Sequence, residues 1–226
     1  MAYAPLAAME PRPPTRGRVL DHVAWLYDPI LEGLSFGRER RFREKTLAHL
    51  PLRAADRVLD VGCGTGSLTL LIARRLVPPG LVIGLDAAPR MIAIARRKAA
   101  RYGLPAGFEV GVAESLPFPD ASFDVAVNSM FAHHVDLELK RLAFAEMHRV
   151  LRPGGALVTA DVDRPTTAAA WITGWGARWA LVQKELADNL RGLLPGLMEE
   201  AGFADVRRVD HVYGLVSFWT ARRPKG

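Results

Sequence analysis

The stretch VLDVGCGTGSL, from Val58 to Leu68, joins an apolar, strand-like run to glycines at alternate positions, Gly62, Gly64 and Gly66. Glycine lacks Cβ, so such a loop turns tightly and lets a bound molecule lie against the backbone. A helix predicted to begin after the loop would point its free N–H groups at the same place. The stretch therefore predicts a strand, a ligand-binding loop and a helix in immediate succession.

Strands and helices alternate along the chain beyond this loop. We predict strands at 57–61, 81–85, 108–112, 123–128 and 156–161, and helices at 67–77, 89–102 and 137–151. Near-continuous apolar strands separated by helices are typical of a parallel sheet covered on both faces. A helix at 193–201 and two strands, at 206–212 and 215–221, are predicted to complete the fold.

The other segments are interpreted as parts of one domain. Residues 1–17 are rich in Ala and Pro and predict a flexible tail, and 18–226 are predicted to form a single domain. Apolar residues at helical spacing indicate an N-terminal helical cap over 18–52 and a helical lid insert over 165–192. The insert carries Trp171, Trp175 and Trp179 on one helix face, which indicates core packing, a lid over a lipophilic acceptor, or contact with a membrane surface.

A second carboxylate indicates which ligand the loop binds. Asp86 ends the run LVIGLD about 20 residues beyond Gly66, where a carboxylate can accept hydrogen bonds from both hydroxyls of a ribose. Dinucleotide sites space their glycines as Gly-x-Gly-x-x-Gly, whereas this loop reads Gly-x-Gly-x-Gly and follows Asp60. A carboxylate at that position would repel a pyrophosphate and suit the ammonium of a methionine moiety, which favours S-adenosylmethionine.

Four successive motifs resemble those of the class I S-adenosylmethionine-dependent methyltransferases: VLDVGCGTG, GLDAAPRMIAIARRKA, AESLPFPDASFDVAVNS and HRVLRPGGALV. The resemblance extends from Asp21 to the C-terminus and is most marked to the ubiquinone/menaquinone C-methyltransferases and related small-molecule methyltransferases. It implies an α/β fold with a Rossmann-like, seven-stranded, mostly parallel sheet whose last strand is antiparallel. Helices would cover both faces, and the N-terminal helices and the insert after the fifth strand would form a cap.

The resemblance also implies S-adenosylmethionine as the cofactor and S-adenosylhomocysteine as its product. Carried over position by position, it implies a cofactor site formed by Tyr27, Asp60, Gly62, Cys63, Gly64, Gly66, Asp86, Ala87, Met91, Ala113, Glu114 and Asn128. Met91 would lie against the adenine, and Cys63 would pack or offer its backbone. The more common family pattern has Asp or Asn where this chain has Val112, so backbone groups of Ala113, with Glu114 nearby, are expected at the adenine edge.

Two histidines follow the predicted fourth strand, in the run NSMFAHHVD. His133 and His134 would lie at the carboxyl edge of the sheet, near the transferable methyl group, and histidine titrates near neutral pH. We expect one of them to be the catalytic base if the acceptor must lose a proton, because neighbouring side chains diverge. The alternative is that they only shape the loop before a helix capped by Asp136. The quinone enzymes typically carry Arg-Asn here, so the subfamily stays open.

Composition restricts the remaining functions. The single cysteine, Cys63, excludes a disulfide framework and a metal–thiolate cluster, so we expect no metal and a cytoplasmic location. The formal net charge of +6 permits attraction to nucleic acid or anionic lipid. The Asn/Asp-Pro-Pro-aromatic motif of amino-methylating nucleic-acid enzymes is absent, because Ser129, Met130 and Phe131 follow Asn128. A nucleic-acid partner is therefore disfavoured.

We thus expect a methyltransferase acting on a small, lipophilic or aromatic acceptor, either quinone-like or a natural product. A phospholipid-headgroup N-methyltransferase in peripheral contact with a membrane is the first alternative. An RNA methyltransferase and a non-catalytic cofactor-binding protein are the others. The sequence leaves open the acceptor, the atom methylated and the oligomeric state.

Overall fold

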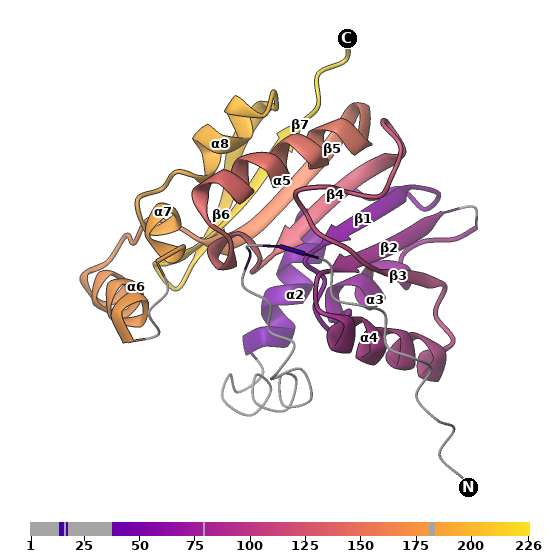
Figure 1. The fold of residues 1–226 in the computed structure, drawn as a ribbon, viewed down its shortest axis with the longest axis horizontal. Coiled ribbons are helices and arrows are strands. Elements are labelled where there is room, and N and C mark those ends of the chain that lie inside the picture. The colour runs from indigo at the N-terminus through magenta and orange to yellow at the C-terminus, as the bar shows by residue number, and fades with distance from the viewer. Residues whose placement is uncertain (1–13, 16, 18–37, 79, 181–183) are drawn as a thin grey trace, which may run out of the picture.

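The computed structural model describes residues 14–15, 17, 38–78, 80–180 and 184–226. Their strands form one seven-stranded sheet in the order β3-β2-β1-β4-β5-β7-β6 (Figure 1). The strands are β1 (Arg57–Val61), β2 (Leu81–Asp86), β3 (Ala106–Val110), β4 (Phe123–Ser129), β5 (Leu151–Val162), β6 (Ala204–Val212) and β7 (Val216–Arg222). The first five strands are parallel to one another, and β7 lies antiparallel between β5 and β6. The predicted mostly parallel sheet with an antiparallel last strand is confirmed.

The helices begin and end where the local chemistry favours it. They are α2 (Arg38–His49), α3 (Ser67–Ala73), α4 (Pro89–Tyr102), the short 3₁₀ helix η2 (Ala132–His134), α5 (Leu137–Val150), α6 (Ala168–Ala180), α7 (Leu186–Leu190) and α8 (Leu194–Glu200). Pro89 opens α4, and Gly103 ends it with a φ of 61°. Asp136 caps α5 by accepting a hydrogen bond of 2.9 Å from the Leu139 amide, as the sequence indicated.

Alternate residues of the central strands face opposite sides of the sheet. Leu59 of β1 and Leu157 of β5 belong to a buried cluster that includes residues of α5 and α8. Their neighbours Val58 and Val158 belong to a second buried cluster, with residues of α2 and α3. Helices therefore cover both faces, as near-continuous apolar strands predicted (Figure 1).

Several boundaries differ from those predicted. β3 begins at Ala106 and ends before Val112, which forms an isolated bridge with Ser115 in the following loop. α3 ends at Ala73, and β5 already begins at Leu151. The insert after β5, predicted to be helical, contains α6, which ends at Ala180, and α7, which starts at Leu186. The predicted N-terminal helix before residue 38 lies outside the described residues.

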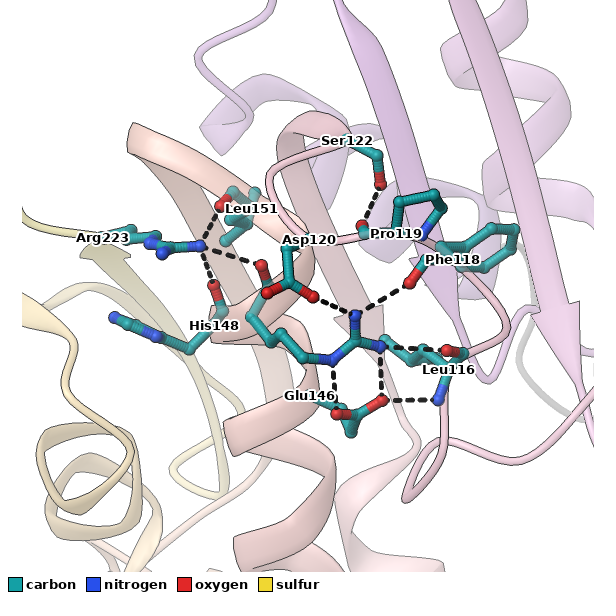
Figure 2. A network of polar contacts seen from close by, with 10 residues as sticks. Leu116, Phe118, Pro119, Asp120, Ser122, Glu146, His148, Leu151 and Arg223 are labelled. Carbon is teal, nitrogen blue, oxygen red and sulfur yellow. Dashed lines mark hydrogen bonds and ion pairs between the residues drawn. The ribbon is translucent and has the colours of Figure 1, made fainter.

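The crossover from β3 to β4 contains no helix within its described residues and is held by Arg149 of α5. The Arg149 guanidinium donates to the carbonyl oxygens of Leu116, at 3.0 Å, and Phe118, at 2.9 Å (Figure 2). It also pairs with Glu146, whose carboxylate accepts the Leu116 amide at 2.7 Å. Hydrogen bonding to Arg149 lowers the pKa of Glu146 below its ordinary value. This network fixes the loop that contains the expected adenine segment, 112–114.

The strand order reverses between β1 and β4, and in parallel sheets ligands bind in the crevice at such a point. Here the loop after β1 meets the loop after β4. A Cβ placed on Gly62, whose φ is 74°, would lie 2.6 Å from the Phe131 ring, so only glycine fits there. The crevice thus brings the glycine loop and the His133–His134 segment together.

Candidate active site

A cavity of about 520 Å³ opens at the crevice between β1 and β4. Its size is in the range of small-molecule sites. It is lined by most of the residues expected in the site: Asp60, Gly62, Cys63, Gly64, Asp86, Ala87, Met91, Ala113, Glu114, His133 and His134. Residues from α2 and from the turn between β6 and β7 complete the described walls. The structure therefore brings the expected cofactor residues and the two histidines into one space.

Three expected cofactor residues are not on the described wall of the cavity. Gly66 precedes α3 with a φ of 75°, and a Cβ there would lie 2.6 Å from the Phe108 ring. Gly66 therefore shapes the loop on the side that packs against Phe108. Asn128 is fully buried and donates to the Thr159 hydroxyl at 2.9 Å, inside the core. The structure thus gives Asn128 a packing role. Tyr27 lies outside the described residues.

The glycine loop is fastened to the end of β2. The amides of Gly62 and Cys63 both donate to the Leu85 carbonyl, at 2.8 and 3.0 Å. The Asp86 carboxylate accepts hydrogen bonds from the Gly64 amide at 2.8 Å and the Ala88 amide at 2.9 Å. Each carboxylate oxygen has two lone pairs, so these two hydrogen bonds do not by themselves use up its capacity to accept ribose hydroxyls.

Cys63 packs beneath the loop. A Cβ on Gly84 of β2 would lie 2.9 Å from the Cys63 sulfur, so the glycine makes room for this side chain. Burial, with the nearby carboxylates of Asp86 and Asp60, raises the pKa of the Cys63 thiol well above its ordinary value. The thiol stays protonated at neutral pH and is a poor nucleophile.

Asp60 is a buried carboxylate at the methionine end expected for the cavity. Burial raises its pKa to about 6, although the Thr69 hydroxyl donates to it at 2.6 Å and the charge of Arg43 opposes the shift. A buried carboxylate is stabilised in its charged form by a bound cation. The position of Asp60 therefore suits an ammonium group.

Arg43 and Glu39, one turn apart on α2, were interpreted from the sequence only as part of the helical cap over 18–52 and were not assigned to the site. Both line the cavity, and they form an ion pair with each other. The described walls hold the carboxylates of Glu39, Asp60, Asp86 and Glu114 against the single guanidinium of Arg43. This excess of negative charge opposes a pyrophosphate and favours a cationic ligand.

The segment expected at the adenine edge is held from the N-terminal side. The Thr15 hydroxyl, in the predicted tail, donates to the Glu114 carboxylate at 2.6 Å. Ala113 and Met91 are buried, and both line the cavity. Thr15 and Gly17 line it too, so at least these two residues of 1–17 belong to the site.

His133 and His134 do not diverge as expected. Both belong to η2, and their ring centroids are 3.9 Å apart. Met130, just before them, has a φ of 54°, a left-handed conformation unusual for a side-chain-bearing residue that redirects the chain after β4. His133 Nδ1 lies 2.6 Å from a carboxylate oxygen of Asp161, at the end of β5. Asp161 was missed from the sequence, although it lies at the end of a strand as Asp86 does.

The tryptophan face of α6 is separate from the described wall of the cavity. Trp171 and Trp179 are 58% and 74% exposed, so core packing does not account for them. Trp175 packs on a cluster with Leu186 and Leu190 of α7. None of the three indoles is among the described lining residues, so the structure provides no contact that makes this face a lid.

Comparison with known proteins agrees with this geometry. The sequence profile of the family described as Methyltransferase domain matches residues 58–155. The chain is similar to a demethylmenaquinone methyltransferase from Thermus thermophilus, at 36% identity over 179 residues, covering 79% of this chain and 77% of that protein. It is also similar to the ubiquinone/menaquinone biosynthesis C-methyltransferase UbiE from a Geobacter species, at 32% identity, covering 89% of this chain and 93% of that protein.

Solved structures share the fold. The cyclase SpnF superposes with a TM-score of 0.68 at 24% identity, covering 93% of this chain and 98% of that chain. An S-adenosylmethionine-dependent methyltransferase from Methanosarcina mazei superposes with a TM-score of 0.60 at 23% identity, covering 80% of this chain and 98% of that chain. At these identities, the likeness supports the Rossmann-like architecture alone.

The first prediction concerns Asp86. Asp86→Asn should weaken S-adenosylhomocysteine binding at least about tenfold, because an amide replaces one acceptor and a hydrogen bond to a charged group is worth ~1.5–3 kcal/mol. Isothermal titration calorimetry measures the change. Glu109→Gln, which alters an exposed carboxylate on the adjacent β3, should bind as the wild type does. Unchanged affinity in folded Asp86→Asn would remove Asp86 from the site.

The second prediction is that Asp60 makes the affinity for S-adenosylhomocysteine depend on pH. Its pKa is raised to about 6, so the carboxylate that attracts an ammonium is charged above that pH and protonated below it. Affinity for S-adenosylhomocysteine should therefore fall as the pH is lowered, by about tenfold between pH 7 and pH 5. Calorimetry at several pH values tests this. In Asp60→Asn, binding should be weak at neutral pH and nearly flat; a wild-type profile in this variant would contradict the assignment.

Proposed function

Because the chain belongs to the class I S-adenosylmethionine-dependent methyltransferases related to UbiE, we propose that it methylates a small lipophilic or aromatic acceptor. The relatives at 36% and 32% identity are named for demethylmenaquinone and for ubiquinone/menaquinone biosynthesis, which makes a hydroquinone or phenol the first acceptor class to consider. The observation that carries the proposal is the cavity around a glycine loop, which is lined by acidic residues and by two histidines.

The residues present fit S-adenosylmethionine. Asp86 would hold the ribose hydroxyls, Asp60 the ammonium, and Arg43 the carboxylate of the methionine moiety. Met91 and the 112–114 segment would enclose the adenine. When bound, the cofactor supplies a methyl group on a positively charged sulfur, and the surrounding carboxylates favour that charge. S-adenosylhomocysteine, which lacks it, would be attracted less strongly.

In addition to the two histidines, the described lining includes apolar side chains. Met130, Phe131 and Val135 line the cavity from the segment after β4, Tyr213 lines it from the turn between β6 and β7, and Val216 lines it from the start of β7. These side chains suit a flat, lipophilic ring, which they would hold by packing. Excluding water and aligning the acceptor are the main requirements of methyl transfer.

A labelled-methyl assay tests the function. Purified protein is incubated with methyl-labelled S-adenosylmethionine and, separately, with a prenylated 1,4-naphthohydroquinone, phosphatidylethanolamine or bulk tRNA. We expect label in the naphthohydroquinone product and none with the other two. Asp86→Asn serves as the control impaired in the cofactor site. Label only in the phospholipid or only in tRNA would establish the corresponding alternative, and binding of cofactor without transfer to any acceptor would favour a non-catalytic protein.

We further propose that α6 contacts an anionic membrane surface, from which a lipophilic acceptor could enter. Trp171, Ile172 and Trp179 are all more than half exposed, and Arg178 lies over two of the indoles. Tryptophan with arginine is typical of helices that lie at a bilayer interface. The helix is linked to the cavity, because Thr166 donates its amide to the Gly214 carbonyl, next to the lining residue Tyr213. Within the described residues, no helix has the length and apolarity needed to cross a bilayer.

Vesicle sedimentation tests this contact. The wild type should pellet with vesicles of phosphatidylglycerol and phosphatidylcholine, and Trp171→Ala/Trp179→Ala should remain largely in solution, since apolar burial contributes about 25 cal/mol per Å². Tyr102→Ala removes an aromatic side chain of comparable exposure from the end of α4 and should pellet normally. Equal pelleting of the tryptophan variant and the wild type would refute the proposed surface.

A further inference from the structure

Asp161 and His133 form a buried pair at the acceptor end of the cavity. Asp161 is fully buried at the end of β5, and its Oδ1 lies 2.6 Å from His133 Nδ1. His133 lines the cavity with 10% of its side chain exposed. Its other ring nitrogen, Nε2, makes no hydrogen bond within the part of the chain that the structure describes. That nitrogen is therefore the one available to a bound molecule.

Asp161 is held as a carboxylate that only accepts hydrogen bonds. Its Oδ2 accepts the Ala132 amide at 2.6 Å, and its Oδ1 accepts the Val162 amide at 2.7 Å and lies 3.4 Å from the Asn189 side-chain amide. Burial alone would raise the pKa of Asp161, but the charge and hydrogen bond of His133, with the charge of His134, lower it below its ordinary value. The carboxylate is thus ionised at neutral pH.

An ionised carboxylate has no proton to give, so the histidine nitrogen that faces it must carry one. Neutral His133 is then the tautomer with hydrogen on Nδ1 and a lone pair on Nε2. Asp161 is fixed by Asn189 from α7, by the Ala132 amide of η2 and by the Val162 amide of β5. Asp161 in turn fixes the His133 ring. This is the arrangement that makes a histidine a positioned base.

We propose that His133 is the general base of the reaction and that Asp161 is the positioning residue that fixes its tautomer, so that the acceptor is a molecule with an ionisable hydroxyl. This inference rests on the proposed function and narrows its substrate class to phenols, hydroquinones and enols. The acceptor O–H bond breaks, its proton bonds to Nε2, and its electron pair stays on the acceptor. The resulting imidazolium is stabilised by Asp161, and its proton returns to water after product release.

The remaining described groups of the cavity are less suited to this step. Asp60, Asp86 and Glu114 lie in the part expected to hold the cofactor, and burial keeps the Cys63 thiol protonated. His134 contacts His133 ring to ring, so it is the rival base. The 2.6 Å contact between His133 Nδ1 and the Asp161 carboxylate favours His133 as the base.

Nitrogen NMR of the cofactor-free protein tests the tautomer without any acceptor. Uniformly ¹⁵N-labelled wild type should show His133 with a protonated Nδ1 and an unprotonated Nε2, assigned by the loss of its signals in His133→Gln. In Asp161→Asn, the amide can donate to Nδ1, so the ring should lose its fixed tautomer or adopt the Nε2–H form. A wild-type His133 protonated on Nε2 alone would overturn the proposal, whether or not Asp161→Asn folds.

Kinetics with 4-substituted 1-naphthols of graded hydroxyl acidity test the base, and calorimetry monitors cofactor binding alongside. His133→Gln should lower kcat about 10²–10⁴-fold for the least acidic naphthol, and the deficit should shrink as the hydroxyl becomes acidic enough to ionise in water. Asp161→Asn should follow the same trend, with cofactor affinity retained in both. His148→Gln, whose ring packs on Phe203 outside the cavity, is the matched control and should behave as the wild type does.

The outcomes separate this inference from the function on which it rests. An equal deficit for every naphthol would make His133 a structural residue, and an acidity-dependent deficit in His134→Gln alone would make His134 the base; either result overturns the proposal. If the wild type methylates no hydroxyl-bearing acceptor but does methylate phosphatidylethanolamine, the substrate class is wrong. The NMR tautomer then reports separately on the Asp161–His133 pair.

Discussion

The attachment of the glycine loop to the end of β2 is the constraint on which the site depends. One carbonyl, of Leu85, accepts two loop amides, and one carboxylate, of Asp86, bridges the amides of Gly64 and Ala88. The loop is thereby fixed before any ligand arrives, so little conformational entropy is lost on binding. It also sets where α3 begins, and Gly62 lets the segment after β4 approach it closely, with Phe131 against the backbone.

The two most buried carboxylates near the cavity have opposite electrostatic environments. Asp60 is desolvated with one hydroxyl donor, and its pKa rises to about 6. Asp161 is equally buried, yet the charge and hydrogen bond of His133, the charge of His134 and the Val162 amide lower its pKa below the ordinary value. When their environments shift the pKa values of two carboxylates in opposite directions, the two groups commonly have different roles in one site. In our account, Asp60 binds a cation and Asp161 orients a base.

The sequence predicted those parts of the site that local chemistry determines. The strand–loop–helix around Gly62 and the carboxylate at Asp86 follow from glycine spacing and strand ends, and the Asp136 cap follows from helix chemistry. The family resemblance implied that Asn128 belongs to the cofactor site. Side chains alternate along a strand, however, and this one faces Thr159 in the core. Without the register of β4, the direction of a side chain cannot be deduced.

The parts of the site that the sequence did not predict are determined by tertiary contacts. Arg43 lies in a charged helix that is typical of a solvent-facing element, and only the docking of α2 beside the glycine loop brings it to the cavity. Asp161 carried the same signal as Asp86, an acid at the end of a parallel strand, but its importance comes from His133, 28 positions earlier in the chain. The exposed indoles of α6 could not be distinguished from core residues by their helical spacing alone.

We infer that the acidic cavity binds the methyl donor with its reactive end toward His133. A crystal structure of the protein with S-adenosylhomocysteine is the decisive measurement. It should show both ribose hydroxyls on Asp86, the amino acid moiety between Asp60 and Arg43, and the sulfur facing the His133 side of the cavity. A ribose bound away from Asp86, or a sulfur pointing away from the histidines, would show that this inference is wrong.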